Sequence, residues 1–128
     1  MEKEVIQTDK AGREKGPFVQ AIKVGNILYL SGCRGIDPET NKVLRDDIRA
    51  EVKQALENMK AVVEAAGGSM VNVIATTVYV RDMYRQRPVI NELYEEYFGQ
   101  DYPTRTIVEI SRLNEDSNVE ITATAWIP

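Results

Sequence analysis

The sequence contains no histidine, and its 128 residues include only one cysteine and one tryptophan. Without an imidazole as base or ligand, the chain cannot form a Ser-His-Asp or Cys-His triad, a zinc-peptidase helix or a facial iron triad. The single Cys33 excludes an intrachain disulfide and a multi-thiolate zinc site, and it is compatible with a reducing compartment. Most familiar hydrolase chemistry is therefore excluded, and no metal site is expected.

Long apolar runs are also missing. The apolar fraction of 43% and the charged fraction of 28% are those of an ordinary globular protein, and no segment is apolar over a length that spans a membrane. Residues 1–16 mix both charge signs and contain no apolar segment, so they do not read as a secretory signal or a transit peptide. A net charge of −4 disfavours binding to a phosphate backbone. We expect one cytoplasmic domain, residues 1–128, that binds neither nucleic acid nor membrane.

Hydrophobic periodicity and turn residues predict the order strand, hairpin, helix, strand, helix, strand, strand. The helices are marked by a capping aspartate before the first, by Pro88 near the first turn of the second, and by glycines after both. The expected elements are a strand at 4–7, a hairpin at 16–32 turning at Gly25-Asn26, a loop at 33–44, a helix from Asp46 or Asp47 to Gly67-Gly68, a strand at 71–81 covered on both faces, a helix at 87–99, and strands at 105–111 and 118–127. This pattern predicts an α+β fold in which two helices pack on one face of a mixed sheet.

The last strand has an unusual polar side. Its apolar side contains Val119, Ile121, Ala123, Ala125 and Ile127, and the other contains Asn118, Glu120, Thr122, Thr124 and Trp126. The strand at 105–111 likewise places Arg105, Ile107 and Glu109 opposite Thr106, Val108 and Ile110. A face of threonines with one carboxylate, one tryptophan and no lysine suits contact with another subunit better than contact with bulk water. The pattern predicts an oligomer.

Arg105 is the best candidate for a substrate anchor. It is the first residue of the strand expected at 105–111, in the stretch YPTRTIVEI, and it directly follows a Pro-Thr pair. A guanidinium there presents a planar fork that matches a carboxylate, and the following backbone N–H groups add donors. The alternative is a structural ion pair at a subunit interface, with Glu109 or Glu120 of a neighbour.

Three further polar residues are candidates for the site. Glu120 lies mid-strand among threonines, where partial desolvation raises a carboxyl pKa and suits the group to deprotonating water; alternatively it is the partner of a buried arginine. Ser31 ends an apolar strand, where its hydroxyl either faces a pocket or belongs to a turn. Asn91 follows the inward-facing Ile90, so its amide either links helix to sheet or is a pocket donor.

Several segments together resemble the RidA/YjgF/YER family of enamine/imine deaminases, over nearly the whole chain. These segments are GPFVQA, LSGCRGIDPETNKV, QALENMKAVVEAAG, TTVYVRDM, INELYEEYF, YPTRTIVEISRL and VEITATA. The resemblance implies a chorismate-mutase-like (YjgF-like) α+β fold. It also implies a homotrimer whose sheets form a central barrel, with three pockets at the subunit interfaces.

The resemblance also implies the chemistry and its residues. Arg105 matches the arginine that binds the substrate carboxylate, Glu120 the glutamate that handles the hydrolytic water, and Ser31 and Asn91 the serine and asparagine of the substrate pocket. Such enzymes hydrolyse C–N bonds in reactive 2-aminoacrylate and related enamines and imines, yielding a 2-keto acid and ammonia. They use no cofactor.

Two positions differ from the commonest pattern of that family. Phe18 stands where many deaminases have tyrosine, and Ile107 stands where many have cysteine. We expect the Phe18 ring to wall the pocket and Ile107 to contribute its backbone N–H. The differences fit either a subfamily that acts on a larger enamine, such as 2-aminomuconate, or a protein with reduced activity. Two other readings are a non-catalytic trimer that binds small ligands and an endoribonuclease or translation inhibitor.

Overall fold

The computed structural model describes residues 2–128, which form one mixed sheet and two α-helices. Five elements precede the second half of the chain: β1 (Glu4–Ile6), β2 (Ala21–Val24), β3 (Ile27–Leu30), β4 (Cys33–Arg34) and α1 (Ile48–Ala65). Then follow the short helix η1 (Met70–Asn72), β5 (Val73–Val80), α2 (Met83–Phe98), β6 (Thr104–Glu109), the short helix η2 (Asn114–Asp116) and β7 (Val119–Trp126). The expected α+β class and element order are confirmed.

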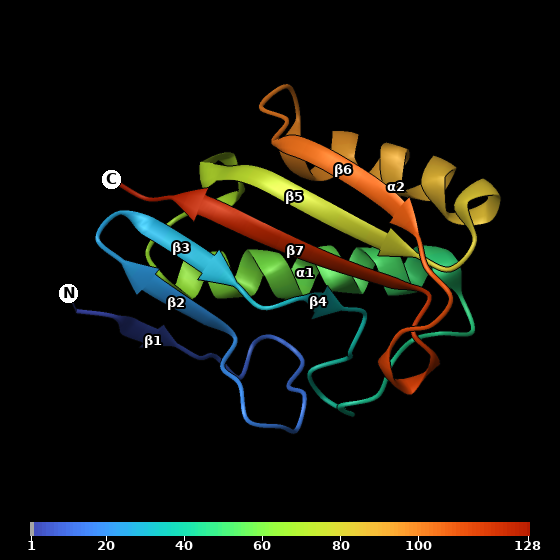
Figure 1. Ribbon diagram of the computed structural model, residues 1–128, viewed down its shortest axis with the longest axis horizontal. Coiled ribbons are helices and arrows are strands. Elements are labelled where there is room, and N and C mark those ends of the chain that lie inside the picture. The colour runs from blue at the N-terminus through green and yellow to red at the C-terminus, as the bar shows by residue number, and fades with distance from the viewer. Residues whose placement is uncertain (1) are drawn as a thin grey trace.

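The strand order is β1-β2-β3-β7-β5-β6, and β4 pairs with β7 beyond the end of β3. All pairs are antiparallel except β5 with β6, which α2 connects as a crossover. Both helices lie on the same side of the sheet, with α2 beside β6 at its edge (Figure 1). The last strand of the chain therefore lies inside the sheet, between strands from both halves of the sequence.

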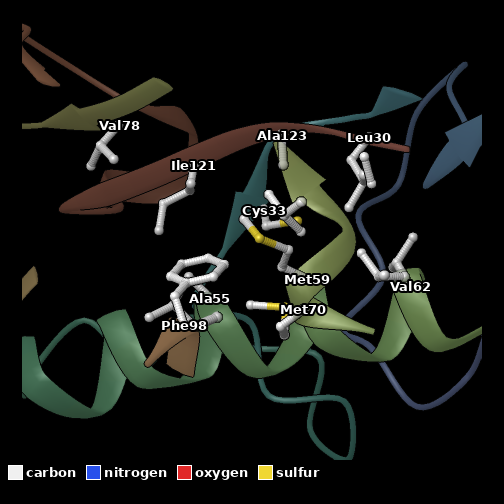
Figure 2. Packing of buried hydrophobic residues seen from close by; sticks show 14 of the residues in the cluster. Leu30, Cys33, Ala55, Met59, Val62, Met70, Val78, Phe98, Ile121 and Ala123 are labelled. Carbon is white, nitrogen blue, oxygen red and sulfur yellow. The ribbon is translucent and has the colours of Figure 1, made fainter. Parts of the chain in front are cut away.

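The core lies between the helices and this side of the sheet. In Figure 2, Cys33 and Ile121 point from the sheet toward Ala55 and Met59 on α1. All four side chains are buried. The apolar stripe of α1 forms because its buried residues recur at helical spacing, and the helix begins where the Asp47 carboxylate accepts a hydrogen bond from the Ala50 N–H at 3.1 Å.

Two details differ from the sequence-based expectation. Helix α2 begins at Met83 and not near Pro88, because the Asp82 side chain caps it by accepting from the Arg85 N–H; Pro88 is inside the helix. The segment expected to be a loop at 33–44 begins with β4, which exists only because Cys33 and Arg34 pair with Ile121 and Glu120 of β7. A two-residue strand held by so distant a partner carries no local signal.

The other side of the sheet, which we call the open face, is not covered by either helix (Figure 1). Strand β5 was expected to be covered on both faces, but within this chain its open side is not packed by a helix and Ile74 is exposed. Tyr29 and Trp126 are also exposed on this face. No helix within residues 2–128 combines the length and the apolar composition that crossing a membrane requires.

Candidate active site

Arg105 lies on the helix side of the edge strand β6. It is paired with Thr76 of β5, whose hydroxyl accepts a hydrogen bond from the Tyr94 hydroxyl of α2 at 2.9 Å. The guanidinium carbon is 5.2 Å from the centre of the Tyr94 ring, and Nη1 donates to Oδ1 of Asn91 at 2.8 Å. The ring beneath the guanidinium and the amide at one corner fix its orientation. Asn91 thus links helix to sheet, one of the two alternatives expected for it.

The Arg105 side chain borders a cleft of about 340 Å³ lined by Asn91, Tyr94, Glu95, Tyr102, Pro103 and Arg105. The bond to Asn91 is the one hydrogen bond its side chain makes with residues 2–128, and none of their carboxylates lies within 4.0 Å. A guanidinium has five N–H donors, so most of the fork is left for a ligand. The alternative reading of Arg105, an ion pair with Glu109 or Glu120 of a neighbouring subunit, involves a second chain and stays a prediction. Within residues 2–128, Glu109 accepts from the Met83 N–H at 2.9 Å.

Glu120 lies on the open face. It is next to Tyr79 in β5 and Arg34 in β4, while its neighbours Val119 and Ile121 are buried under the helices. Its carboxylate rests on Gly32, where an added Cβ would lie 2.5 Å from the carboxyl carbon. Burial raises the pKa of Glu120, and the nearby Glu14 carboxylate raises it further, whereas Arg34 opposes the change. The expected direction of this shift is confirmed.

Behind Glu120 lies a buried ionic group that we call the Arg34 cluster, consisting of Arg34, Glu14, Glu115, Ser117 and Glu120. The guanidinium donates from Nε to Glu14 at 3.0 Å, from Nη2 to Glu115 at 2.9 Å, and from Nη1 to the Ser117 hydroxyl at 2.7 Å. Its Nε lies 4.0 Å from a Glu120 oxygen. The arginine side chain is fully buried. The alternative reading of Glu120, as partner of a buried arginine, therefore also describes the structure.

Ser31 and Phe18 lie beside this cluster. The Ser31 hydroxyl donates to the carbonyl of Val19 at 2.6 Å and so fastens the segment that carries Phe18 to the end of β3. Both residues line a small cavity of about 30 Å³ that also reaches Gly32 and Arg34. The Phe18 ring is 45% exposed, which leaves one side of it free to contact a ligand or another chain. Ile107 is instead on the helix side, packed against the core beside Val78.

The six sequence-predicted site residues thus lie in separate places. Arg105, Asn91 and Ile107 belong to the helix side at β6, and Glu120 lies on the open face. Ser31 and Phe18 line the cavity beyond the end of β3, which α1 also borders. Strand β5 separates β6 from β7 in the sheet. One chain therefore does not bring Arg105 and Glu120 to a common ligand.

Sequence reasoning missed Glu14 and Arg34, and it gave Gly32 no part in the site. Glu14 and Arg34 are distant in the sequence from Glu115 and Glu120, so the contacts among them depend on the fold. The one local signal is Arg34 itself, a charged residue between Cys33 and Gly35 at the end of an apolar strand. Such an arginine has to be paired if it is buried.

Within residues 2–128 no group of three metal-ligating carboxylates or thiols is assembled. Burial, followed by the nearby Glu120 and Glu14 carboxylates, raises the pKa of Cys33 to about 12. The thiol is therefore protonated at neutral pH and is a poor nucleophile. Of the ionisable groups singled out from the sequence, the Arg105 guanidinium borders the cleft and the Glu120 carboxylate is half-buried on the open face.

The site thus combines a cleft that contains an oriented guanidinium with a half-buried carboxylate on the opposite face of the mixed sheet of a small α+β protein. A family model described as Endoribonuclease L-PSP matches residues 8–127. The RutC family protein PH0854 of Pyrococcus horikoshii is 48% identical, covering 97% of this chain and 98% of its own. The 2-iminobutanoate/2-iminopropanoate deaminase of Dermatophagoides farinae is 40% identical over 93% and 92%.

Among solved structures, the crystal structure of RidA from the Antarctic bacterium Psychrobacter sp. PAMC 21119 superposes with a TM-score of 0.92 at 40% identity, covering 97% of this chain and 99% of that one. The chain belongs to the Endoribonuclease L-PSP family, which includes these RutC and RidA proteins. The resemblance read from the sequence is thereby confirmed.

Proposed function

We propose that this protein is a hydrolase of C–N bonds that deaminates enamines and imines of the 2-aminoacrylate type to 2-keto acids and ammonia. The observation that carries the proposal is the Arg105 fork, which is oriented by Asn91 and Tyr94 in an open cleft. Because no carboxylate of residues 2–128 pairs with the Arg105 guanidinium, this group is suited to binding the carboxylate of an imino acid. The deaminase name of the mite relative supports the same reaction.

The active site is built between subunits of a homotrimer. Arg105 and Glu120 face opposite sides of the sheet, so a ligand that touches both has to lie between two copies of the chain. The open face, with Thr77 and Thr122 side by side and Tyr29 and Trp126 exposed, supplies the surface for that contact. Three open faces turned inward form a central barrel with three equivalent interface sites.

In the reaction, Arg105 and the backbone N–H of Ile107 hold the substrate carboxylate. Glu120 of the adjoining subunit takes a proton from a water molecule, and the water oxygen bonds to the imine carbon. The C=N electron pair moves to nitrogen, which is protonated. In the resulting carbinolamine the hydroxyl proton is transferred to the amino nitrogen, so that the C–N bond breaks, ammonia leaves and C=O forms. Neutralising the carboxylate at Arg105 makes the adjacent carbon a better electrophile.

Phe18, with Ser31 behind it, forms the wall of the pocket on the Glu120 side. The Phe18 ring has no hydroxyl to bind substrate or water, and Ile107 offers only its backbone because its side chain packs into the core. These positions leave room for specialisation toward a larger enamine such as 2-aminomuconate. We propose that the whole chain acts as one domain, in the cytoplasm, where such reactive intermediates are released.

A non-catalytic trimer that binds small carboxylates through the same clefts is the main competing function. The two are separated by measuring ammonia and keto-acid release while an amino-acid oxidase generates imino acids in the same solution. The proposed enzyme accelerates release, and Arg105→Ala abolishes the acceleration, whereas Arg112→Ala, which changes an exposed arginine after β6, keeps it. Binding that depends on Arg105 without any acceleration, for small and aromatic imino acids and for 2-aminomuconate, contradicts the enzyme and supports the binding protein.

A further inference from the structure

The Arg34 cluster contains more carboxylates than cations, and the binding of a substrate carboxylate by Arg105 does not explain this arrangement. Three carboxylates, from Glu14, Glu115 and Glu120, surround one guanidinium that is fully buried. Glu14 and Glu115 receive direct hydrogen bonds, whereas the nearest Glu120 oxygen lies 4.0 Å from the guanidinium Nε. Glu120 is thus the member of the cluster that feels the cation without being fully bound by it.

We propose that Arg34 is a positioning residue of the active site, which fixes Glu120 and keeps its carboxylate ionised for water activation. The inference rests on the proposed deaminase function. Glu14 has the opposite influence: it is a second carboxylate that competes for the same cation and disfavours the charge on Glu120. The activity of the base is therefore set by the balance between one buried cation, Arg34, and one partly buried anion, Glu14.

The surroundings of Glu120 support this balance from every side. β4 supplies Arg34 and the protonated Cys33 thiol, and the N-terminal segment supplies Glu14. β5 places Tyr79 next to Glu120 in register. The short helix η2 supplies Glu115, which reaches only the far side of Arg34. Among the described residues around Glu120, Arg34 is the one cation.

The backbone holds the arginine and the glutamate in fixed relation. Arg34 and Glu120 are direct partners in the β4–β7 pairing, and the Asn58 amide of α1 donates to the carbonyls of Arg34 and Ile36 at 3.0 and 2.8 Å. The absence of a side chain at Gly32 lets the Glu120 carboxylate lie against the chain beside the cation. The guanidinium cannot move away from Glu120 without breaking its bonds to Ser117 and to the Asn114 carbonyl.

The test compares the ionisation of Glu120 in charge variants. Carboxyl signals of ¹³C-glutamate are titrated by NMR in the wild type, Arg34→Met, Arg34→Lys and Glu14→Gln, with Glu120→Gln identifying the Glu120 signal. The acid limb of kcat/KM is measured on the same proteins. Arg34→Met is expected to move both midpoints to higher pH by about one unit or more, and Glu14→Gln to move them to lower pH, because removing a cation and removing an anion have opposite effects on a carboxyl group. Arg34→Lys, which keeps the charge, stays near the wild type.

The matched control is Arg45→Gln, which removes a cation from the neighbouring exposed pair with Asp116 and leaves the midpoints unchanged. If Arg34→Met does not fold, Glu14→Gln and Arg34→Lys still decide the matter. Unchanged midpoints in Glu14→Gln, or a shift in the same direction as in Arg34→Met, overturn the proposal. A wild type with the expected NMR shifts but no imine turnover contradicts the deaminase function and leaves the charge balance standing.

Discussion

Arg105 and Glu120 lie on opposite faces of one sheet, separated by strand β5. Arg105 is next to Thr76, on the side that α2 covers, and Glu120 is next to Tyr79, on the open face. Because side chains alternate along a strand, no rotamer of either residue reaches the other face of the sheet. The two halves of the chemistry proposed above meet only when a second copy of the chain supplies one of them.

The Asn91–Arg105 bond predicts a change in substrate affinity. Asn91→Ala frees one corner of the guanidinium, so the fork has to be ordered when the substrate binds. We expect KM to rise about 10-fold, the equivalent of one hydrogen bond to a charged group, with a smaller change in kcat. Steady-state kinetics with imino acids of several sizes measure this, and Glu92→Ala, at the next exposed position, is the control. An unchanged KM would show that Asn91 does not orient Arg105.

Gly32 offers a way to displace the base without removing it. In Gly32→Ala the new Cβ lies where the Glu120 carboxyl group now rests, 2.5 Å from its carbon, so the carboxylate has to move outward. We expect kcat to fall about 10- to 100-fold while the melting temperature changes little, since the displaced group is the end of a flexible side chain. A variant with full activity would mean that the position of this carboxylate is not critical.

Much of the fold follows from local sequence, and the elements that were predicted wrongly depend on residues outside the segment that suggested them. Helix α1 was predictable because Asp47 caps it and its apolar stripe is regular. The start of α2 was not predicted correctly. Pro88 suggested that the first turn lies near it, whereas the helix is capped by Asp82, more than one turn earlier. Strand β4 was missed because its two residues are ordered only by pairing with β7, a partner more than eighty residues away.

The same distinction applies to the site. Arg105, Asn91 and Glu120 were identifiable because each is a polar residue in an otherwise apolar pattern, and the resemblance to a family gave them roles. Alternation along the strands predicted which side chains share a face with Arg105 and which with Glu120. It did not predict that the two faces contribute to one site. The Arg34 cluster joins three separate segments, and long-range contacts between charged side chains leave no periodic pattern in a sequence.

The raised pKa of Glu120 has a consequence for stability. Burial, with the added effect of Glu14, places the pKa in the folded state above its value in the unfolded chain. The contribution to stability is therefore complete below the unfolded pKa and is lost as pH rises through the folded pKa. We expect Glu120→Gln, which cannot ionise, to be more stable than the wild type at neutral pH, with the difference shrinking as pH falls through the raised folded pKa to the ordinary pKa of glutamate. Urea unfolding at neutral and acidic pH measures it, and a constant difference would contradict the shift.

Glu51 makes a structural link between the start of α1 and the start of β7. Its two carboxylate oxygens accept from the backbone and side-chain nitrogens of Asn118 at 2.7 and 2.8 Å, and the residue is fully buried. Glu51→Ala leaves those donors unsatisfied, so we expect the free energy of unfolding to fall by about 2–4 kcal/mol. Chemical denaturation gives the value, with the exposed Glu64→Ala as control. A loss as small as that of the control would show that water replaces the carboxylate.

The family model carries the description of an endoribonuclease, and this too is open to test. The chain has no histidine and a net charge of −4, so an acid–base pair and a basic groove for RNA are both unfavoured. We expect purified protein to leave RNA intact at low salt. Cleavage that is lost in Arg105→Ala, and therefore does not come from a contaminant, would contradict this expectation.

Sharing of the active site between subunits is the central claim, and mixed oligomers test it most directly. Arg105→Ala and Glu120→Gln are each expected to be inactive. When the two variants are co-expressed with different tags and the mixed trimers are isolated, about one in three interface sites receives an intact Arg105 from one chain and an intact Glu120 from the next. Recovery of imine hydrolysis in the mixed trimers is the predicted result. Mixed trimers as inactive as the two parents would show that both residues act from the same chain and would contradict the shared site.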